Sequence, residues 1–301
     1  YVEVNINPVI YIDIKIKKYI KIIYMNCENK YIFYKDSPVI KLNNSCGDNS
    51  IVLDCDRCDI HKKSFIGSGG YNSTFLIKTE KCQNSNCQNS INNNGILRLS
   101  HKYLDSEEIF NEKLGLYLQA LFSLSKKKKG KGCRHICKVY DFGEYQVENK
   151  SLANIIFKCD YKDKKDCKSI NFEKNDFDKG VYGILENIPG GDLFDRLLDK
   201  SKKNHHFNEE DVGNMMGQLL LALYCMHSNG FVHLDVKPEN ILLKNKKKDS
   251  NFKLIDFGFV KYIPEDPGYI DPSDFGRAGT PTYKAPEVNF SNECNQKADI
   301  W

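Results

Sequence analysis

The sequence predicts an α+β fold, and three observations support this prediction. Residues 10–16 alternate between isoleucine and other side chains, which is the period of a half-buried strand. Apolar side chains from Val212 to Met226 recur at helical spacing, which predicts a long core helix. With 301 residues, the chain is long enough to bury one large core or two separate lobes.

The charge balance excludes some classes of partner. The chain has 44 basic and 40 acidic residues, a net charge of +4 that does not favour nucleic-acid binding. Much of the basic excess lies in runs at 126–129 and 246–248, which are typical of solvated insertions. No apolar run is long enough to span a membrane. The chain begins with Tyr1 and shows no secretory signal, so we expect part of a longer protein whose targeting the sequence does not show. The expected location is intracellular and cytoplasmic.

The 12 cysteines predict free thiols in a reducing compartment, because a chain of this length does not need a disulfide scaffold. A zinc site formed by Cys55, Cys58, Cys82 and Cys87 is the alternative. The spacing of these four residues is loose, and no histidine lies at a ligand interval. We therefore favour free thiols.

Two short motifs indicate the chemistry of the chain. Residues 233–240 read His-Leu-Asp-Val-Lys-Pro-Glu-Asn, and residues 256–258 read Asp-Phe-Gly. This pair in this order is typical of a catalytic loop and a metal-binding turn for phosphoryl transfer. The chain therefore resembles the eukaryotic protein kinases. Its hinge segment and its catalytic loop are most similar to those of the calcium/calmodulin-dependent and myosin-light-chain-kinase-like branch.

The resemblance implies a role for each polar residue of these motifs. Asp235 would accept the proton of the substrate hydroxyl, and Lys237 would present its charge to the transferred γ-phosphoryl group. Asn240 and Asp256 would supply oxygen ligands to Mg²⁺, which is a hard cation. Thr280, in a segment that resembles the peptide-docking loop, would form a hydrogen bond near Asp235 and Lys237.

Residues 65–77 resemble two strands joined by a glycine-rich phosphate loop, in which backbone N–H groups can approach phosphate oxygens. Asn72 replaces the third glycine of that loop, and Thr74 replaces the valine that usually contacts the base. By resemblance, four residues would bind the phosphates of ATP: Gly67, Ser68, Gly69 and Gly70.

The next strand and helix carry a predicted ion pair. Residues 95–100 resemble the strand that holds a phosphate-binding lysine, and Arg98 stands at the matching position. Lys102 is a competing candidate, but it leaves little room before the helix. Ser106 is a plausible N-cap for that helix, and Glu112 would be the partner of Arg98.

Residues 181–194 match the strand and hinge of the family closely. By resemblance, the backbone groups of Glu186 and Ile188 would bind adenine, and Leu185 would be the gatekeeper. Asp192 would face the ribose or a basic residue of the substrate.

The resemblance implies a two-lobed protein-kinase fold, with a small antiparallel-sheet lobe that carries one helix and a mostly helical large lobe. We expect an N-terminal extension of unknown function at 1–59, the small lobe with insertions at 60–182 and the large lobe at 183–301. By the same resemblance, Asp299 and Trp301 begin the central helix of the large lobe, so this lobe is expected to be truncated.

The expected function is an ATP-dependent and Mg²⁺-dependent protein serine/threonine kinase. Lys237 and the Gly-Thr-x-x-Tyr pattern at 279–283 favour serine and threonine over tyrosine as substrates. Asp192 and Glu239 would hold basic residues that precede the phosphoacceptor. The sequence does not indicate which oligomeric state the protein adopts.

Two alternatives remain. A pseudokinase or nucleotide-binding scaffold is suggested by departures in the small lobe, at Asn72, Thr74, Ile96 and Arg98. A small-molecule kinase of related fold is disfavoured, because residues 279–287 match the loop that holds protein substrates.

Overall fold

The structure is a computed structural model, and it describes a defined part of the chain. The described residues are 39–44, 47–52, 65–68, 72–78, 94–100, 106–124, 132–147, 179–247, 250–263, 269, 278–290 and 293–301. The chain divides into two compact units. One unit comprises 1–103 with 143–182, and the other comprises 104–142 with 183–301. The strand predicted at 10–16 and the candidate zinc ligands Cys55, Cys58, Cys82 and Cys87 lie outside the described residues.

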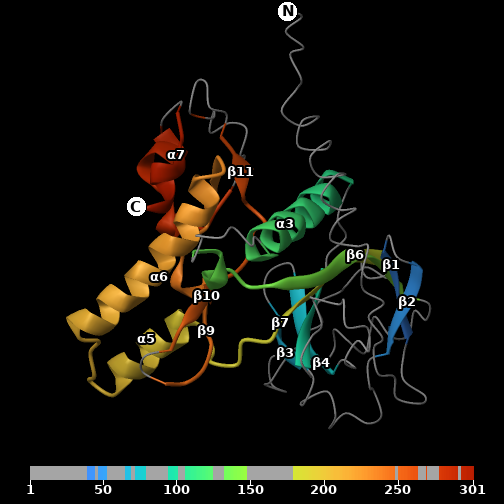
Figure 1. Cartoon of the computed structure of the whole chain (residues 1–301), viewed down its shortest axis with the longest axis horizontal. Helices are drawn as coiled ribbons and strands as arrows, with labels where there is room; N and C mark the ends of the chain where they lie inside the picture. The colour runs from blue at the N-terminus through green and yellow to red at the C-terminus, as the bar shows by residue number, and fades with distance from the viewer. Residues whose placement is uncertain are drawn as a thin grey trace, which may run out of the picture. The chain divides into compact units, whose positions relative to one another are not determined.

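A seven-stranded sheet has the strand order β2-β1-β6-β7-β5-β4-β3 (Figure 1). The pairs β1–β2, β1–β6, β3–β4 and β4–β5 are antiparallel. The β1–β2 hairpin therefore extends the sheet along β6. The strands are β1 Val39–Asn44, β2 Gly47–Val52, β3 Phe65–Ser68, β4 Asn72–Lys78, β5 Asn94–Ser100, β6 Val139–Val147 and β7 Lys179–Glu186.

Alternation of side chains explains the core of the first unit. Leu97 and Leu99 of β5 are 0% and 1% exposed, whereas Ile96 and Arg98, which alternate with them, are only half-buried. Phe75 of β4 pairs with Leu97 across the strands and is also buried. Successive side chains of a strand point to opposite faces, so one face of this hairpin is apolar and the other carries Arg98.

The second unit is mainly helical and contains short two-stranded sheets. Its sheets pair β9 with β10 and β8 with β11. The antiparallel sheet and the helices together confirm the predicted α+β fold. The elements are α3 Ser106–Leu124, η1 Gly132–His135, α5 Leu193–Lys202, α6 Glu209–His227, β8 Phe231–Val232, η2 Pro238–Asn240, β9 Ile241–Leu243, β10 Phe252–Leu254, β11 Lys261–Tyr262, η4 Pro281–Tyr283, α7 Pro286–Phe290 and η5 Gln296–Asp299.

Helix α6 confirms the helix predicted from the apolar spacing between Val212 and Met226. Its N-cap is Asn208, whose Oδ1 accepts a hydrogen bond from the backbone N–H of Asp211 at 2.7 Å. Acidic residues occupy its first turn, where the helix dipole favours negative charge. Its buried face consists of Leu219, Ala222, Leu223, Cys225 and Met226.

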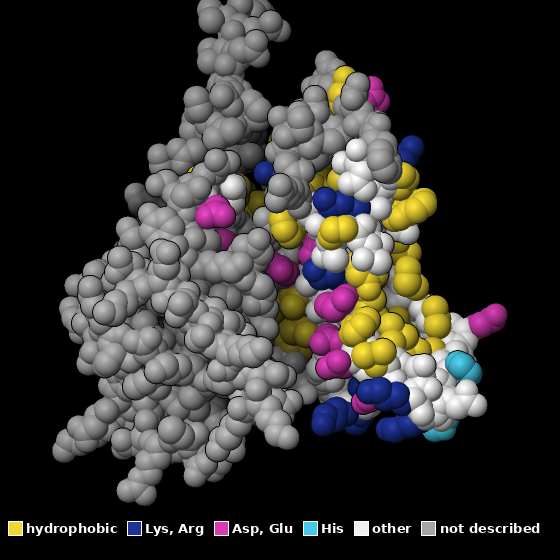
Figure 2. All heavy atoms as spheres, turned by 180° about the vertical axis from the view of Figure 1, so that it is seen from behind, with side chains coloured by type: hydrophobic (Ala, Val, Ile, Leu, Met, Phe, Trp, Pro, Cys, Tyr) yellow, Lys and Arg dark blue, Asp and Glu magenta, His cyan; other side chains and the backbone are white. Residues whose placement is uncertain are grey.

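A second apolar stripe of α6 is exposed. Val212, Met216, Leu220 and Tyr224 recur every four residues, and Tyr224 is 69% exposed. Figure 2 shows hydrophobic side chains gathered over the helical part of the described chain. Contiguous apolar surface of this kind favours association.

The described cysteines correct one expectation. Cys137 and Cys294 are buried and free, as predicted. Cys225 of α6 is disulfide-bonded, so the prediction of a free thiol is wrong there. Among the described residues, no helix is long and apolar enough to cross a membrane.

Replacing the exposed apolar stripe of α6 should reduce self-association. We expect Tyr224→Lys and Leu220→Lys to lower the concentration-dependent increase in molecular mass measured by light scattering, because each removes apolar surface and adds charge. Asn214→Lys on the same helix is the control, because Asn214 is exposed but lies off the stripe. Equal effects of all three substitutions would show that charge alone, and not the stripe, governs solubility.

Candidate active site

The carboxylate of Asp235 is the centre of a closed hydrogen-bond network. Its Oδ1 accepts hydrogen bonds from the backbone N–H of Thr280 at 2.8 Å and from Thr280 Oγ1 at 2.7 Å. Its Oδ2 lies 2.8 Å from Lys237 Nζ and accepts a hydrogen bond from Asn240 Nδ2 at 2.9 Å. Lys237 Nζ also donates to Thr280 Oγ1 at 2.6 Å. The structure therefore brings together four of the five predicted catalytic residues.

This network keeps Asp235 ionised although its side chain is only 1% exposed. Burial alone would raise the pKa of the carboxyl group, but hydrogen bonds from Lys237, Thr280 and Asn240 outweigh burial and hold the pKa below its ordinary value. Four donors on one carboxylate also fix its orientation. The carboxylate is thus a weak base that is well placed to align a hydroxyl group.

The neighbouring His233 is neutral. Burial lowers its pKa, and the carboxylates of Asp299, Asp256 and Asp235 offset this only in part. Nδ1 accepts a hydrogen bond from the backbone N–H of Asp235 at 3.3 Å, and Nε2 lies 3.3 Å from the carbonyl oxygen of Ile255. A carbonyl can only accept, so the ring proton is on Nε2. The imidazole therefore links the catalytic loop to the residue before Asp256.

Asp299 holds the backbone of the catalytic loop. Its Oδ2 accepts from the backbone N–H of His233 and its Oδ1 from that of Leu234, both at 2.8 Å. Oδ2 also lies 2.8 Å from Nε2 of His227, at the end of α6. Leu234 has a φ of +65°, a left-handed conformation that is unfavourable for a leucine. These two hydrogen bonds stabilise that conformation and direct Asp235 toward Thr280.

The hairpin of β9 and β10 places the two predicted metal ligands. Asn240 directly precedes β9, and Asp256 follows β10. The backbone N–H of Ile255 donates to the carbonyl oxygen of Asn240 at 2.9 Å, which joins the two ends of the hairpin. Asn240 Nδ2 donates to both the carbonyl and the carboxylate of Asp235, and no described residue donates a hydrogen bond to its Oδ1. An amide oxygen and a carboxylate are suitable ligands for Mg²⁺.

Helix α3 packs on the turn that contains Asp256. A Cβ atom added to Gly115 of α3 would lie 2.7 Å from the carbonyl oxygen of Phe257, so only glycine permits this approach. Phe257 is 1% exposed, and its ring lies 5.1 Å from that of His233. The position of α3 thus constrains the Asp256–Gly258 turn.

The predicted hinge joins the same hairpin. Glu186 is the last residue of β7, and Ile188 is buried. The backbone N–H of Gly190 donates to the carbonyl of Leu243, and that of Leu243 donates to the carbonyl of Gly191, both at 2.8 Å. A Cβ atom at Gly190 would lie 2.1 Å from the Leu243 carbonyl, so this contact requires glycine.

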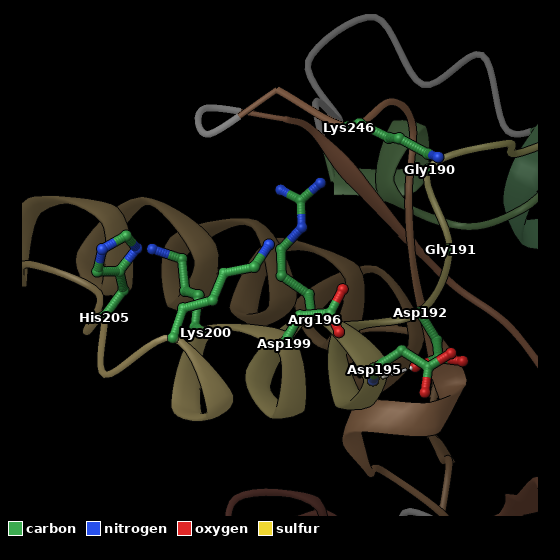
Figure 3. A pocket seen from close by; sticks show the side chains of 10 residues that line it. Gly190, Gly191, Asp192, Asp195, Arg196, Asp199, Lys200, His205 and Lys246 are labelled. Atoms are coloured by element: carbon green, nitrogen blue, oxygen red, sulfur yellow. Dashed lines mark hydrogen bonds between the residues drawn. The ribbon is translucent and has the colours of Figure 1, made fainter.

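Asp192 follows the hinge and caps α5. Its Oδ1 accepts from the backbone N–H of Asp195 at 2.7 Å. The two residues lie at one end of a pocket of about 550 Å³, and Lys200 and His205 lie at the other end (Figure 3). Arg196 of α5 donates hydrogen bonds to the carbonyl oxygens of Asn245 and Lys247. These bonds fix the segment that forms one wall of the pocket.

The family of the chain follows from a comparison with known proteins. The family model described as "Protein kinase domain" matches residues 128–301, which is more than half of the chain. The chain belongs to the protein kinase family. The network around Asp235 and the β9–β10 hairpin lie within the matched region.

Similar curated kinases support this assignment. The chain is 39% identical over 130 residues to calcium/calmodulin-dependent protein kinase type 1 of Caenorhabditis briggsae, and the match covers 43% of this chain and 34% of the relative. Its identity to the Caenorhabditis elegans protein of that name is 38% over the same shares. It is 39% identical over 125 residues to human serine/threonine-protein kinase DCLK3, covering 41% of this chain and 18% of the relative. The chain thus spans about a third or less of these relatives.

The predicted phosphate-binding residues remain predictions. Gly67 and Ser68 lie in β3, whereas Gly69 and Gly70 lie outside the described residues. Arg98 lies on β5 in the first unit and Glu112 on α3 in the second. The predicted ion pair between them is not tested.

Sequence reasoning missed two residues that position the site. Asp299 was expected only to begin a helix, because nothing in the local sequence indicates that its carboxylate binds the backbone of the catalytic loop. Gly115 lies within a helix, where a lone glycine is a weak signal. Its close approach to Phe257 depends on tertiary packing.

Substitution of Gly115 should destabilise the kinase. We expect Gly115→Ala to lower the free energy of unfolding by about 1–3 kcal/mol, because the added methyl group overlaps the Phe257 carbonyl. Gly217→Ala on α6 is the matched control, since a Cβ atom there meets nothing within 4 Å. It should raise stability by about 0.5–1 kcal/mol through helix propensity and chain entropy. Denaturant unfolding measures both; stabilisation by Gly115→Ala would disprove the packing argument.

The lowered pKa of Asp235 predicts a pH dependence of stability. The ionised carboxylate stabilises the folded state above the unfolded pKa, about 3.9, and this contribution is lost as pH falls through the lower folded pKa. The stability difference between the wild type and Asp235→Asn should therefore be constant from pH 7 to about pH 4 and should change below that. Unfolding in urea across this pH range tests the prediction. Glu210→Gln is the control, because Glu210 is an exposed residue of α6. A change between pH 5 and 7 would contradict the lowered pKa.

Proposed function

We propose that this protein is an ATP-dependent protein serine/threonine kinase that transfers the γ-phosphoryl group of ATP to protein substrates. The observation that carries the proposal is the network in which Asp235 contacts Lys237, Asn240 and Thr280. The names of the similar proteins, which include serine/threonine-protein kinase DCLK3, agree with it.

Asp235 would align the substrate hydroxyl and accept its proton. Its four hydrogen-bonding positions are filled by Thr280, Lys237 and Asn240, so a hydroxyl must replace one donor. Lys237 has the longest and most flexible side chain of the three. Its ammonium group can leave Asp235 for a phosphoryl oxygen, which opens a position for the hydroxyl and moves positive charge to where negative charge develops.

Asn240 and Asp256 would hold Mg²⁺ through Oδ1 of the amide and the carboxylate. Two observations support this assignment: no described residue donates a hydrogen bond to Oδ1 of Asn240, and the hairpin fixes both residues. The metal ion would neutralise charge on the phosphates. The hydrogen bonds from Asn240 Nδ2 to Asp235 would keep the amide oxygen directed away from Asp235.

The remaining nucleotide contacts are assigned from the resemblance of the sequence to the protein kinase family. The backbone of Glu186 and Ile188 would bind adenine, and Asp192 would face the ribose or a basic residue of the substrate. By the same resemblance, Arg98 with Glu112 would hold the phosphates, as would the glycine-rich loop formed by Gly67, Ser68, Gly69 and Gly70.

The carboxylates of Glu239 and Asp192 would bind basic residues that precede the phosphoacceptor of the substrate. Oε2 of Glu239 is buried and has no hydrogen-bond partner among the described residues, a costly state that a guanidinium or ammonium group would relieve. Asp192 and Asp195 give one end of the α5 pocket a negative charge.

A nucleotide-binding pseudokinase is the second candidate. Arg98 favours it, because a planar guanidinium stands where the family resemblance requires a compact ammonium group. Direct measurement of transfer separates the two candidates.

Asp235→Asn should abolish transfer while nucleotide binding persists. We expect kcat for a basic serine peptide to fall by about 100-fold or more, and the KM for ATP to change by less than about threefold, because Asp235 would contact the hydroxyl and not ATP. The assay uses radiolabelled ATP, the purified full-length protein and Glu210→Gln as control. Phosphoamino acid analysis should find phosphoserine with this peptide and phosphothreonine with a matched threonine peptide.

Absence of transfer by the wild type, with nucleotide still bound, would favour the pseudokinase. Near-full activity of Asp235→Asn would remove Asp235 from the catalytic role.

A further inference from the structure

An ion pair joins the hinge to the middle of β10. Lys253 Nζ lies 2.8 Å from Oε2 of Glu186, and their side chains are only 12% and 20% exposed. Among the described residues, Lys253 is the only ion-pair partner of Glu186. The same Nζ lies 3.4 Å from the carbonyl oxygen of Ile136, so the ammonium group bridges two chain segments.

Glu186 is held by both its backbone and its side chain. Its backbone N–H donates to the carbonyl of Lys138 at 2.9 Å, and its Oε2 accepts from the backbone N–H of Lys138 at 3.2 Å. Cys137, next to Lys138, is fully buried. Its burial is the main cause, and the negative charge of Glu186 the second cause, that raises the pKa of its thiol to about 12. The thiol is therefore neutral, and it does not compete with Glu186 for the charge of Lys253.

The other end of the hinge is attached to the same hairpin in a different way. Gly190 and Gly191 form two backbone hydrogen bonds with Leu243 of β9. These bonds require glycine at 190, because a Cβ atom there would meet the Leu243 carbonyl, but they use no side-chain group. Of the two attachments, only the ion pair between Glu186 of β7 and Lys253 of β10 depends on two charged side chains.

The β9–β10 hairpin also carries the proposed metal ligands. Asn240 lies directly before β9, and Asp256 lies two positions after Leu254, the last residue of β10. A shift of β10 relative to the hinge would therefore change the distance between the adenine-binding segment and the metal-binding residues.

We propose that Lys253 is a positioning residue for the nucleotide: its ion pair with Glu186 sets the position of the hinge relative to Asp256 and Asn240. The inference rests on the proposed function, because it assumes that the hinge binds the base and that Asp256 binds the metal ion. Exposed ion pairs contribute little, but this pair is largely buried, and removal of one partner leaves a buried charge without compensation.

The test compares three single variants in the full-length protein. Lys253→Met removes the charge and keeps most of the apolar stem. Lys253→Arg keeps the charge. Lys244→Met removes the lysine that directly follows β9. The side chain of Lys244 is exposed and forms no ion pair with the described residues. Each variant is measured for kcat, for the KM of ATP, for direct binding of a fluorescent ATP analogue with Mg²⁺ and for melting temperature.

We expect Lys253→Met to raise the KM for ATP and the dissociation constant of the analogue by roughly tenfold, with kcat reduced by less than about threefold. Lys253→Arg should stay within about threefold of the wild type in both constants, because it retains the ion pair. Lys244→Met should not change either constant.

Two results would overturn the proposal. Unchanged nucleotide affinity in Lys253→Met would show that the ion pair does not position the hinge. A lower melting temperature with unchanged KM would assign Lys253 a purely structural role. Failure of the wild type itself to bind the analogue would instead contradict the proposed function, and this inference with it.

Discussion

The carboxylate of Asp299 imposes the constraint on which the site depends. It binds the backbone N–H groups of His233 and Leu234, and these hydrogen bonds offset the cost, about 1–2 kcal/mol, of a left-handed leucine. The resulting turn brings the Leu234 carbonyl so close to residue 279 that a Cβ atom there would lie 2.4 Å away. Gly279 is therefore required, and Thr280 can follow it into contact with Asp235.

The β9–β10 hairpin connects the catalytic loop to other parts of the second unit. Short backbone and side-chain contacts tie it to the catalytic loop through Asn240 and to the hinge through Leu243 and Lys253. The hairpin has three residues in each strand, so small displacements of one contact reach the others. The groups that would bind the base, the metal ion and the substrate hydroxyl are therefore linked through this hairpin.

Local sequence predicted the parts of the site that are close in the chain. Asp235, Lys237 and Asn240 lie within six residues, and the resemblance of this motif and of Asp-Phe-Gly at 256–258 to the protein kinases indicated their shared function. Long-range contacts were not predictable: Asp299, Gly115 and Lys253 act through packing that no local pattern records. The disulfide bond of Cys225 was missed for the same reason, because pairing depends on proximity in the fold. The phosphate contacts of Arg98 remain predictions.

The most direct test of this account is a crystal structure of the protein with Mg²⁺ and a non-hydrolysable ATP analogue. The account predicts that the metal ion is bound by Oδ1 of Asn240 and the carboxylate of Asp256, with adenine on the backbone of Glu186 and Ile188. A nucleotide bound elsewhere, or a metal ion that contacts neither Asn240 nor Asp256, would contradict it.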